Sequence, residues 1–321
     1  MMRILFLGDI VGRPGRSILA ENLRRIREEL KVDFVIANAE NAAGGNGITK
    51  SIAKDLFKFG VDAITLGDHL WDQRSLEGEI DSVECMCRPA NIPQGNPGRD
   101  FTIVEKGGVR LGVFCLLGQT LMKIKSDCPY AAATRMVEKI SPLCDAVFLD
   151  FHAETSSEKV SMGWHLDGKV AAVVGTHTHI PTADARVLPQ GTAYQTDAGM
   201  TGPWEGCLGR DWRPVLDKFV DGRPRQFKMA LYDSRICGCL IDYDLDLRAA
   251  KTIETFVWPA FHSTWESRQA ETARQREKAE QAAADARQAA ERAASLAAQA
   301  CAQDSSRPQE NLAGLGAAPE A

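Results

Sequence analysis

Short apolar runs that alternate with amphipathic stretches fill the first two thirds of the sequence, and they constrain the fold more than any other feature. The runs have the length and composition of buried strands: MRILFLGD, DFVIANAE, AITLGD, RLGVFCLLG, AVFLDFH and AAVVGTH. Helical patterns lie between the early runs, as in RSILAENLRRIREEL and in TKSIAKDLFKFG, which has a cap at Thr49 and a stop at Gly60. This alternation predicts an α/β fold in which at least part of the sheet is parallel. From about residue 191 onward, GTAYQTDAG, QFKMALYD and RICGCLIDYDLD predict antiparallel strands, so we expect mixed sheets.

The composition changes abruptly after Trp258-Pro259, and this change sets the expected domain boundaries. We expect a main domain over residues 1–262, a helical extension rich in Ala, Glu and Arg over 263–301, and a disordered tail over 302–321. Ser263 and Glu266 have the spacing of a capping box. Alanines recur in steps of 4 and 3 along the extension, at positions 279, 283, 286, 290, 293, 297 and 300. They could form a thin coiled-coil seam, but we favour a solvated single helix because Ala buries little area per contact.

Composition and charge exclude several classes of function. The apolar share of 44% and the charged share of 25% are typical of a soluble globular protein, and a net charge of −5 gives no reason to expect nucleic acid as a stable partner. The N-terminal apolar run is too short for a signal peptide, and no stretch of about 18 uncharged apolar residues predicts a membrane span. The nine cysteines are odd in number and scattered, which favours reduced thiols in the cytoplasm.

Potential metal ligands follow the predicted strands at the points where these strands end. In open α/β sheets, ligand sites gather beyond the carboxyl ends of strands, so side chains far apart in the sequence can converge. Each motif alone also has an ordinary explanation, since a Gly-Asp after a strand is often a turn and a lone His near a sheet is usually hydrogen-bonded. The joint pattern favours a site, and its members are Asp9, Glu40, Asn41, Asp68, His69, His152, His177 and His179.

The residue types in this set indicate the kind of metal. Oxygen and imidazole donors without thiolates suit Fe, Mn or Zn better than they suit a sulfur-rich structural site, and we expect Fe or Mn before Zn. About seven donors are too many for one tetrahedral ion. They fit two divalent ions about 3.5–4 Å apart, an arrangement that stabilises in-line displacement at phosphorus.

Several stretches resemble the YmdB-like calcineurin-type metallophosphoesterases, in order from about residue 2 to residue 258. These stretches are FLGDIVGRPGR, NAENAAGGNGIT, GDHLWD, DFHAETSSEK, GTHTH and TDAGMTGP. The resemblance implies a four-layer fold, in which two mixed sheets lie face to face with helices outside, and a dinuclear metal centre. It also implies an enzyme that hydrolyses phosphodiesters, including 2′,3′- or 3′,5′-cyclic nucleotides, by attack of a metal-bound hydroxide. The expected partner is therefore a small-molecule phosphodiester, and a homo-oligomer is compatible with the sequence.

The resemblance also assigns roles to the residues at the strand ends. Carried over by position, the residues that would hold the first ion are Asp9, Glu40, Asn41 and His179. Glu40 would bridge to the second ion, whose other ligands would be Asp68, His152 and His177. His69 would protonate the leaving oxygen. Ordinary calcineurin-type enzymes carry Asp-x-His after the first strand, whereas residues 9–11 here are Asp-Ile-Val, so we expect Asn41 to fill that ligand position.

Asp68 departs from the family pattern, which has Gly-Asn-His where this chain has Gly67-Asp68-His69. An Asn amide can bind a metal through its oxygen while its NH₂ donates to the substrate, whereas an ionised Asp can only accept. Asp68 also lowers the net positive charge of the centre, so a tighter metal site with weaker attraction for phosphate follows. The alternative function is therefore a catalytically weakened, metal-binding regulatory or interaction protein. In that case the helical extension mediates self-association or partner contact.

Overall fold

The computed structural model describes residues 1–304 of the chain, which forms two compact units that divide after Ala260. The first unit contains every strand among the described residues, and the described part of the second is dominated by one helix, α6 (Trp265–Asp304). Residues 302–304 of the predicted tail end this helix, and the rest of that tail lies outside the described residues. No helix among residues 1–304 is both long and apolar enough to cross a membrane.

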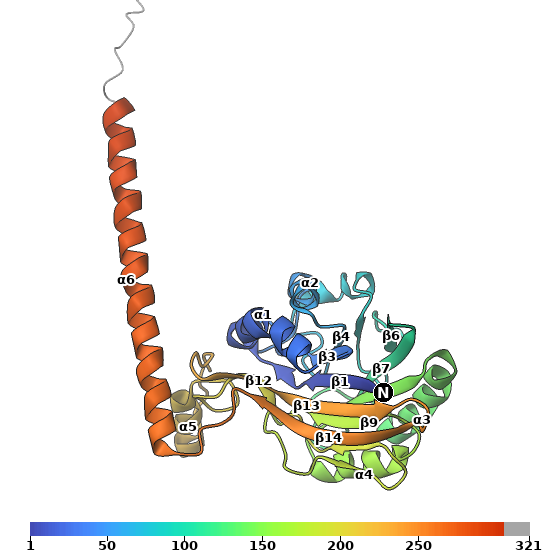
Figure 1. Cartoon of the computed structure of the whole chain (residues 1–321). Coiled ribbons are helices and arrows are strands. Elements are labelled where there is room, and N and C mark those ends of the chain that lie inside the picture. Colours follow the sequence, from blue (N-terminus) through green and yellow to red (C-terminus); the bar gives the residue numbers. More distant parts are fainter. Residues whose placement is uncertain (305–321) are drawn as a thin grey trace, which may run out of the picture. The chain divides into compact units, whose positions relative to one another are not determined.

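Eight strands of the first unit form one mixed sheet (Figure 1). In spatial order they are β2 (Asp9–Ile10), β12 (Met200–Pro203), β13 (Ser234–Asp244), β1 (Met2–Leu7), β3 (Phe34–Asn38), β4 (Ala63–Thr65) and β5 (Met86–Cys87), with β14 (Ala249–Trp258) also paired to β13. β1, β3, β4 and β5 run parallel, and β13 runs antiparallel to β1, β12 and β14. The carboxyl ends of β1, β3 and β4 therefore lie at the same edge of the sheet.

Six further strands form a second mixed sheet. Their spatial order is β10 (Arg186–Val187), β11 (Ala193–Gln195), β9 (Ala172–Thr176), β8 (Ala146–His152), β7 (Val109–Leu117) and β6 (Phe101–Lys106). The four central strands run parallel, and the two edge strands run antiparallel to their neighbours. The carboxyl ends of β8 and β9 consequently lie side by side.

Three clusters of buried apolar side chains hold four layers together. One cluster lies between the two sheets, where the ring centroids of Phe6 in β1 and Phe148 in β8 are 4.9 Å apart. A second packs α1 (Gly12–Glu29) and α2 (Lys50–Phe59) on the outer face of the first sheet, and a third packs α3 (Pro129–Ile140) and α4 (Ser156–Leu166) on the outer face of the second. Figure 1 shows α1 and α2 on one side of the strands and α4 on the other. The predicted four-layer fold is confirmed.

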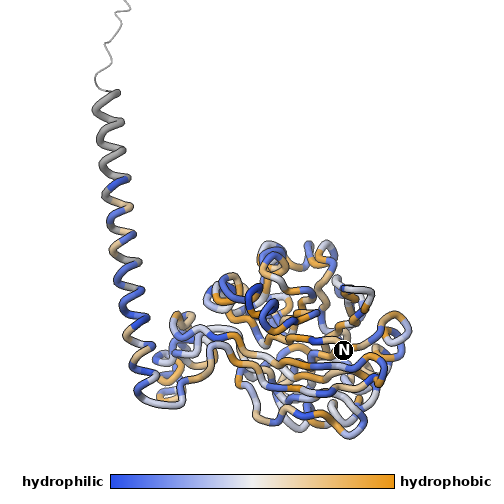
Figure 2. Tube along the Cα trace, in the orientation of Figure 1, coloured by the Kyte–Doolittle hydropathy of each residue, from blue (hydrophilic) through white to orange (hydrophobic). Residues whose placement is uncertain are grey.

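The strand β1 shows why the central runs of the sequence are apolar without alternation. Ile4 and Phe6 belong to the cluster between the sheets, and Leu5 and Leu7 belong to the cluster under α1 and α2. Successive side chains of a strand point to opposite faces, so a strand covered on both faces needs an apolar residue at every position. Figure 2 shows these apolar residues concentrated in the strands of the first unit.

The ends of two helices test the capping predictions. Thr49 Oγ1 accepts a hydrogen bond from Ile52 N at 3.3 Å, and Gly60 ends α2 with a φ of 114°, so both predicted ends of this helix are confirmed. For α6 the predicted cap at Ser263 is wrong by one residue, since Thr264 Oγ1 accepts from Ser267 N at 3.2 Å. The remaining helical elements are α5 (Trp212–Asp221) and three short turns of 3₁₀ helix, Arg74–Leu76, Ile80–Ser82 and Ser141–Leu143.

The prediction of antiparallel strands after residue 191 is only partly confirmed. β13 is antiparallel to all three of its neighbours, as predicted. β11 pairs in parallel with β9 and antiparallel with β10, because the chain returns to the second sheet by a crossover rather than a hairpin on that side. The stretch QFKMALYD forms no strand and contributes an isolated bridge between Met229 and Arg210.

The cysteines and α6 are the last features for which the sequence makes a prediction. The eight cysteines whose side chains the structure describes form no disulfide, and Cys87, Cys237 and Cys239 are buried in strands. The ninth, Cys301, has a side chain outside the described part. Figure 2 shows mainly hydrophilic residues along the described part of α6. Most alanines of the predicted seam have side chains outside that part, so the choice between a seam and a solvated helix stays a prediction.

Candidate metal centre

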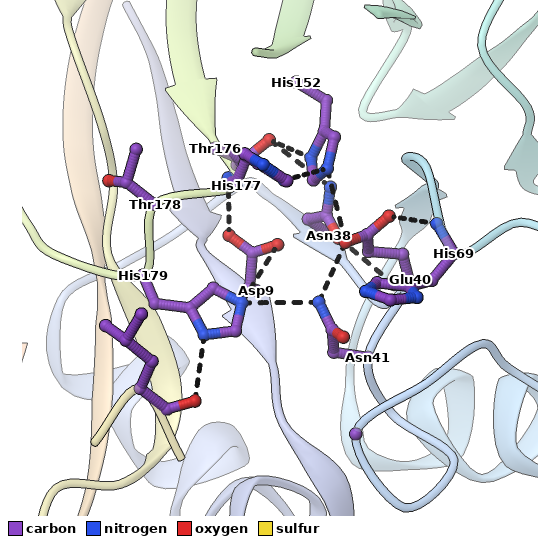
Figure 3. A network of polar contacts seen from close by, with 12 residues as sticks. Asp9, Asn38, Glu40, Asn41, His69, His152, Thr176, His177, Thr178 and His179 are labelled. Carbon is purple, nitrogen blue, oxygen red and sulfur yellow. Dashed lines mark hydrogen bonds and ion pairs between the residues drawn. The ribbon is translucent and has the colours of Figure 1, made fainter. Parts of the chain in front are cut away.

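The seven predicted metal ligands converge from the strand ends of both sheets. Figure 3 labels six of them: Asp9, Glu40, Asn41, His152, His177 and His179. The first sheet supplies the oxygen donors, from β2 and from the turns after β3 and β4: Asp9, Glu40, Asn41 and Asp68. The second sheet supplies the imidazoles, from the end of β8 and the turn after β9: His152, His177 and His179. Parallel strands place these residues together because their carboxyl ends lie at a common edge.

Four of these residues form a tight group, which we call the inner cluster: Glu40, Asp68, His152 and His177. One donor atom of each lies within 4.8 Å of the donor atoms of the others. His152 Nε2 is the centre, at 3.3 Å from Glu40 Oε1, 3.2 Å from Asp68 Oδ1 and 3.0 Å from His177 Nδ1. All but His177 are buried. Oxygen and imidazole donors this close together suit one divalent ion.

The other three residues form a looser group, which we call the outer group: Asp9, Asn41 and His179. His179 Nε2 lies 3.9 Å from Asp9 Oδ1 and 3.4 Å from Asn41 Nδ2. Asn41 Nδ2 also donates to Glu40 Oε1 at 2.8 Å. Glu40 therefore faces both the inner cluster and the outer group, which is where a bridging carboxylate would have to lie.

The amide of Asn41 turns its nitrogen, and not its oxygen, toward Glu40 and His179. Only the oxygen of an amide has lone pairs to offer a metal. Ligation by Asn41 therefore requires a half turn of the amide about its last side-chain bond, which would exchange the two atoms. The assignment of Asn41 as a ligand stays a prediction.

Two buried carboxylate oxygens indicate that each group can receive a cation. Asp9 Oδ1 in the outer group and Asp68 Oδ2 in the inner cluster have no hydrogen-bond partner among the described residues. A buried carboxylate oxygen without a partner is costly unless a cation neutralises it. Gly67 keeps the inner cluster open, since a Cβ there would overlap Glu40 Oε2 and would lie 2.5 Å from His152 Nε2. The residues present thus fit the divalent ions that the family resemblance implies.

His152 is oriented from behind by two buried residues. Thr176 Oγ1 donates to Asp150 Oδ1 at 2.6 Å and lies 2.9 Å from His152 Nδ1. Because the single hydroxyl proton is given to Asp150, Thr176 accepts from Nδ1–H, and Nε2 is left to face the inner cluster. Burial raises the pKa of Asp150 to about 6, although hydrogen bonds from Thr176, Thr65 and Asn38 oppose that rise.

The other two histidines are held in the same manner. His177 Nε2 lies 3.1 Å from Glu154 Oε2, and His179 Nδ1 lies 3.3 Å from the carbonyl oxygen of Leu208. Carboxylates and carbonyls only accept, so these ring nitrogens carry the protons. The opposite nitrogens, His177 Nδ1 and His179 Nε2, then present lone pairs to the inner cluster and the outer group. Fixing the remote nitrogen in this way is how proteins prepare imidazole for a metal.

A buried ion pair holds the turn that carries His177 and His179. Lys159 Nζ, from α4, donates at 2.7 Å both to Asp197 Oδ2 and to the carbonyl that ends β9. The same Asp197 oxygen accepts from the backbone N–H and the hydroxyl of Thr178. Both histidines of the turn have positive φ, 99° and 66°, a region that residues other than Gly rarely adopt. The contacts of Lys159 and Asp197 offset that backbone strain.

The positive charge of a protonated His152 and the negative charges of Glu40 and Asp68 stabilise one another in the inner cluster. Burial disfavours the imidazolium, yet the carboxylates of Glu40 and Asp68 hold the pKa of His152 well above its ordinary value. Burial opposes ionisation of both acids, but His152 lowers the pKa of Glu40, and His152 with His177 lowers the pKa of Asp68. A ligand imidazole must be neutral, so a metal ion would replace the proton of His152.

His69 lies beside the inner cluster and is held by an acid of its own. Its backbone N–H donates to Glu40 Oε2 at 3.0 Å, and its Nδ1 lies 2.7 Å from Asp72 Oδ2. The Asp72 carboxylate accepts from Nδ1–H and fixes the ring, which leaves Nε2 for a substrate. This arrangement separates His69 from the ligand set and suits an acid catalyst.

A cavity of about 350 Å³ opens over both groups. Its lining includes Glu40, Asn41, His69, His177 and His179, together with Glu154, Leu208 and Arg210. This volume is in the range of sites for small molecules. A larger cavity of about 580 Å³ lies beside Arg88 and Lys139, and none of the predicted site residues lines it.

Comparison with known proteins shows the family to which the chain belongs. The family profile described as YmdB-like protein matches residues 5–256. The chain belongs to the YmdB-like family. A relative from Bacillus subtilis (strain 168), named 2′,3′-cyclic-nucleotide 2′-phosphodiesterase, is 44% identical over 253 residues, which cover 79% of this chain and 96% of the relative. This membership confirms the predicted family and the predicted enzyme class, metallophosphoesterase.

Two solved structures of similar proteins agree with the fold. A crystal structure of a hypothetical protein from Thermus thermophilus has a TM-score of 0.75 and 38% identity, and the match covers 80% of this chain and 99% of that one. A crystal structure of a novel phosphatase from Mycoplasma pneumoniae has a TM-score of 0.75 and 30% identity, over 80% of this chain and 92% of that one.

In this member of the YmdB-like family, several residues that support the site carry no role in the sequence analysis. Asp72 lies three positions after His69, and Glu154 two positions after His152, so a search for acids near each histidine would have found them. Leu208 acts through its backbone carbonyl, which leaves no mark in the sequence. The pairing of Lys159 with Asp197 depends on how α4 packs against the second sheet.

Proposed function

We propose that the protein hydrolyses small phosphodiesters, and in particular 2′,3′- or 3′,5′-cyclic nucleotides, at a centre of two divalent metal ions. One observation carries the proposal: each of the three histidines presents one ring nitrogen to the acids while an acceptor holds its other nitrogen. The name of the B. subtilis relative, a 2′,3′-cyclic-nucleotide 2′-phosphodiesterase, supports the substrate class.

The inner cluster would hold one ion and the outer group the other, with Glu40 shared between them. We expect Fe or Mn before Zn, since the donors are oxygen and imidazole nitrogen. When bound, the ions would lower the pKa of a water molecule and neutralise the charge that develops on phosphate. The domain proposed to carry the activity is residues 1–262, which contain every donor and His69.

His69 would act on the leaving group. Displacement at phosphorus expels an alkoxide, which is a strong base, so a proton delivered to the departing oxygen lowers the barrier. Asp72 holds the ring through Nδ1 at 2.7 Å, and His69 lines the cavity over the metal groups. Nε2–H is then the proton donor, while Asp72 orients the ring through Nδ1.

Steady-state kinetics with added Mn²⁺ test this proposal on two diesters, bis-p-nitrophenyl phosphate and a 2′,3′-cyclic nucleotide. We expect the wild type to hydrolyse both. In His69→Ala, kcat on the cyclic nucleotide should fall by about 100-fold or more. The loss on bis-p-nitrophenyl phosphate should be smaller, because p-nitrophenolate leaves without a proton. Metal content should stay unchanged.

A matched control is His165→Ala, which removes a histidine from α4 outside the cavity lining. It should leave both rates unaltered. Full activity of His69→Ala on the cyclic nucleotide would remove His69 from the mechanism. Absence of hydrolysis of any diester by the metal-loaded wild type would overturn the proposed activity itself.

A second candidate function is favoured by Asp68. Both of its inner-cluster contacts are with imidazoles, at 3.2 Å from His152 and 3.5 Å from His177, and an ionised Asp offers no donor to phosphate. A metal-binding regulatory or interaction protein with muted catalysis would follow, with α6 as the partner-binding element. Two bound ions without turnover would support it. Deleting residues 263–321 and measuring the mass in solution would separate an oligomer made by α6 from one made by the first unit.

A further inference from the structure

Arg210 lines the cavity over the metal groups and brings a positive charge to a lining that also contains acids. Among the described residues that line this cavity, it is the only Lys or Arg, and the acids there are Glu40 and Glu154. Within the described part, no hydrogen bond or ion pair joins it directly to any of the seven predicted ligands. Arg210 thus contributes a separate positive charge to the same space.

The guanidinium is fixed against the turn that follows Asn41. Nη1 donates to the carbonyl of Gly44 at 3.2 Å, and Nη2 donates to the carbonyl of Gly45 at 2.9 Å and to Asn46 Oδ1 at 2.5 Å. A Cβ at Gly45 would lie only 2.6 Å from Nη2, so the two surfaces touch. The backbone of Arg210 is closed into a turn by reciprocal hydrogen bonds with Cys207 at 2.8 and 2.9 Å.

The charge of Arg210 forms no ion pair with a carboxylate among the described residues. All three of its hydrogen-bond acceptors are neutral. The side chain is half-buried, and burial lowers the pKa of Arg210. A guanidinium that is partly removed from water and lacks a carboxylate is a strong attractor for phosphate, which it binds with charge-assisted hydrogen bonds.

We propose that Arg210 binds a second phosphate group of the substrate, so that the preferred diester is a nucleoside cyclic phosphate that also carries a 5′-phosphate. This inference rests on the proposed function. The reacting phosphodiester lies at the metal groups and His69. The second phosphate lies against the part of the cavity wall made by Gly45 and Arg210, neither of which is a predicted metal ligand.

Kinetics on a matched pair of substrates test this role: a nucleoside 2′,3′-cyclic phosphate with a 5′-hydroxyl and the same compound with a 5′-phosphate. In the metal-loaded wild type, the 5′-phosphate should lower KM by about tenfold or more, the usual range for a charged hydrogen bond, with little change in kcat. In Arg210→Met that advantage should disappear, so that the two compounds have the same KM. Arg210→Lys should keep part of the advantage.

Arg213→Met is the matched control, because Arg213 is an exposed arginine at the start of α5 and does not line the cavity. It should preserve the full 5′-phosphate advantage. Equal KM values for the two compounds in the wild type would overturn the inference, and so would an advantage that survives in Arg210→Met. A loss of kcat on both compounds in Arg210→Met would assign Arg210 to holding the turn, and not to the substrate.

Calorimetry with the corresponding products separates this inference from the proposed activity. The products are a nucleoside 3′-monophosphate and its 3′,5′-bisphosphate, and their binding to the metal-loaded protein needs no turnover. The bisphosphate should bind about tenfold more tightly in the wild type and no more tightly in Arg210→Met. If the wild type hydrolysed no diester but showed this Arg210-dependent difference, the proposed activity would fail and the second phosphate site would stand.

Discussion

The inner cluster and the outer group share the turns after β3 and β9, yet the structure holds their side chains in place to different degrees. In the inner cluster, donor atoms of four residues lie within 4.8 Å of one another, and His152 is backed by the buried pair Thr176 and Asp150. In the outer group, His179 Nε2 lies 3.9 Å from Asp9 Oδ1, and Asn41 directs its amide nitrogen, which cannot bind a metal, toward His179. The remote nitrogen of His179 rests on a backbone carbonyl at 3.3 Å.

The difference shows that the donor atoms of one site can be preorganised for a metal to different degrees. The inner cluster already has a ligand arrangement, so little reorganisation is needed on binding. In the proposed two-ion centre, the outer group would have to close around its ion, and Asn41 would have to turn its amide. Because reorganisation reduces net affinity, we expect the inner cluster to bind its ion more tightly than the outer group. Glu40, which contacts both, should couple them.

The largest expected effect comes from Glu40→Gln, which removes the shared charge. Both ions should be lost or strongly weakened, and kcat/KM should fall on the order of 10³-fold, since residues that act as a unit fail together. Metal analysis and diesterase assays check this outcome. Glu21→Gln, on the exposed face of α1, is the control and should change neither. Loss of one ion alone would show that Glu40 serves one group and does not bridge.

Lys159→Met should have the next largest effect, because it acts on both groups through the turn that carries His177 and His179. Asp197 would be left buried without its cation, at a cost of about 3–5 kcal/mol in the free energy of unfolding. Metal affinity should fall by about 10–100-fold, as for other residues that support ligands. Thermal unfolding and Mn²⁺ titration measure the two quantities.

Lys169→Met serves as the control for that variant, since Lys169 is exposed and its ammonium contacts only the carbonyl of His165 among the described residues. It should leave both the melting temperature and the metal affinity close to wild type. If Lys159→Met were destabilised without any loss of metal affinity, the ion pair would support the fold and not the turn.

The smallest expected effect is a gain. Asp68→Asn introduces the residue expected from the family pattern, adds an N–H donor to the inner cluster and removes one negative charge from it. Diesterase kcat/KM should rise several-fold, and affinity for the inner ion should fall by a similar factor. Kinetics and Mn²⁺ titration on the same preparation test both. No change in rate or metal content would show that Asp68 does not weaken catalysis in this chain.

The parts of the molecule that follow from local patterns could be predicted from sequence, and those that depend on distant packing could not. The buried strands and the ends of α2 follow from periodicity and capping signals. The convergence of Asp9, His152 and the other predicted ligands follows from the rule about strand ends. The partner strand of β11 does not, because parallel and antiparallel neighbours require the same residues.

The supports of the site were hidden for the same reason. Lys159 and Asp197 are 38 positions apart, and the sequence around either residue does not indicate that the two will pair. Arg210 lies 164 positions from Asn46, with which it shares a hydrogen bond. The amide orientation of Asn41 depends on its neighbours in space and has no counterpart in the sequence. Ligand types are thus readable from the chain, whereas the degree to which they are held in place is a property of the fold.

Manganese titration of the metal-free full chain, followed by direct metal analysis, tests the central claim most directly when wild type and His179→Ala are compared. The account predicts two ions per chain in the wild type, bound with distinct affinities, and one ion in His179→Ala, with the tighter affinity unchanged. A single ion in the wild type, or the same two ions in His179→Ala, would contradict the division into an inner cluster and an outer group.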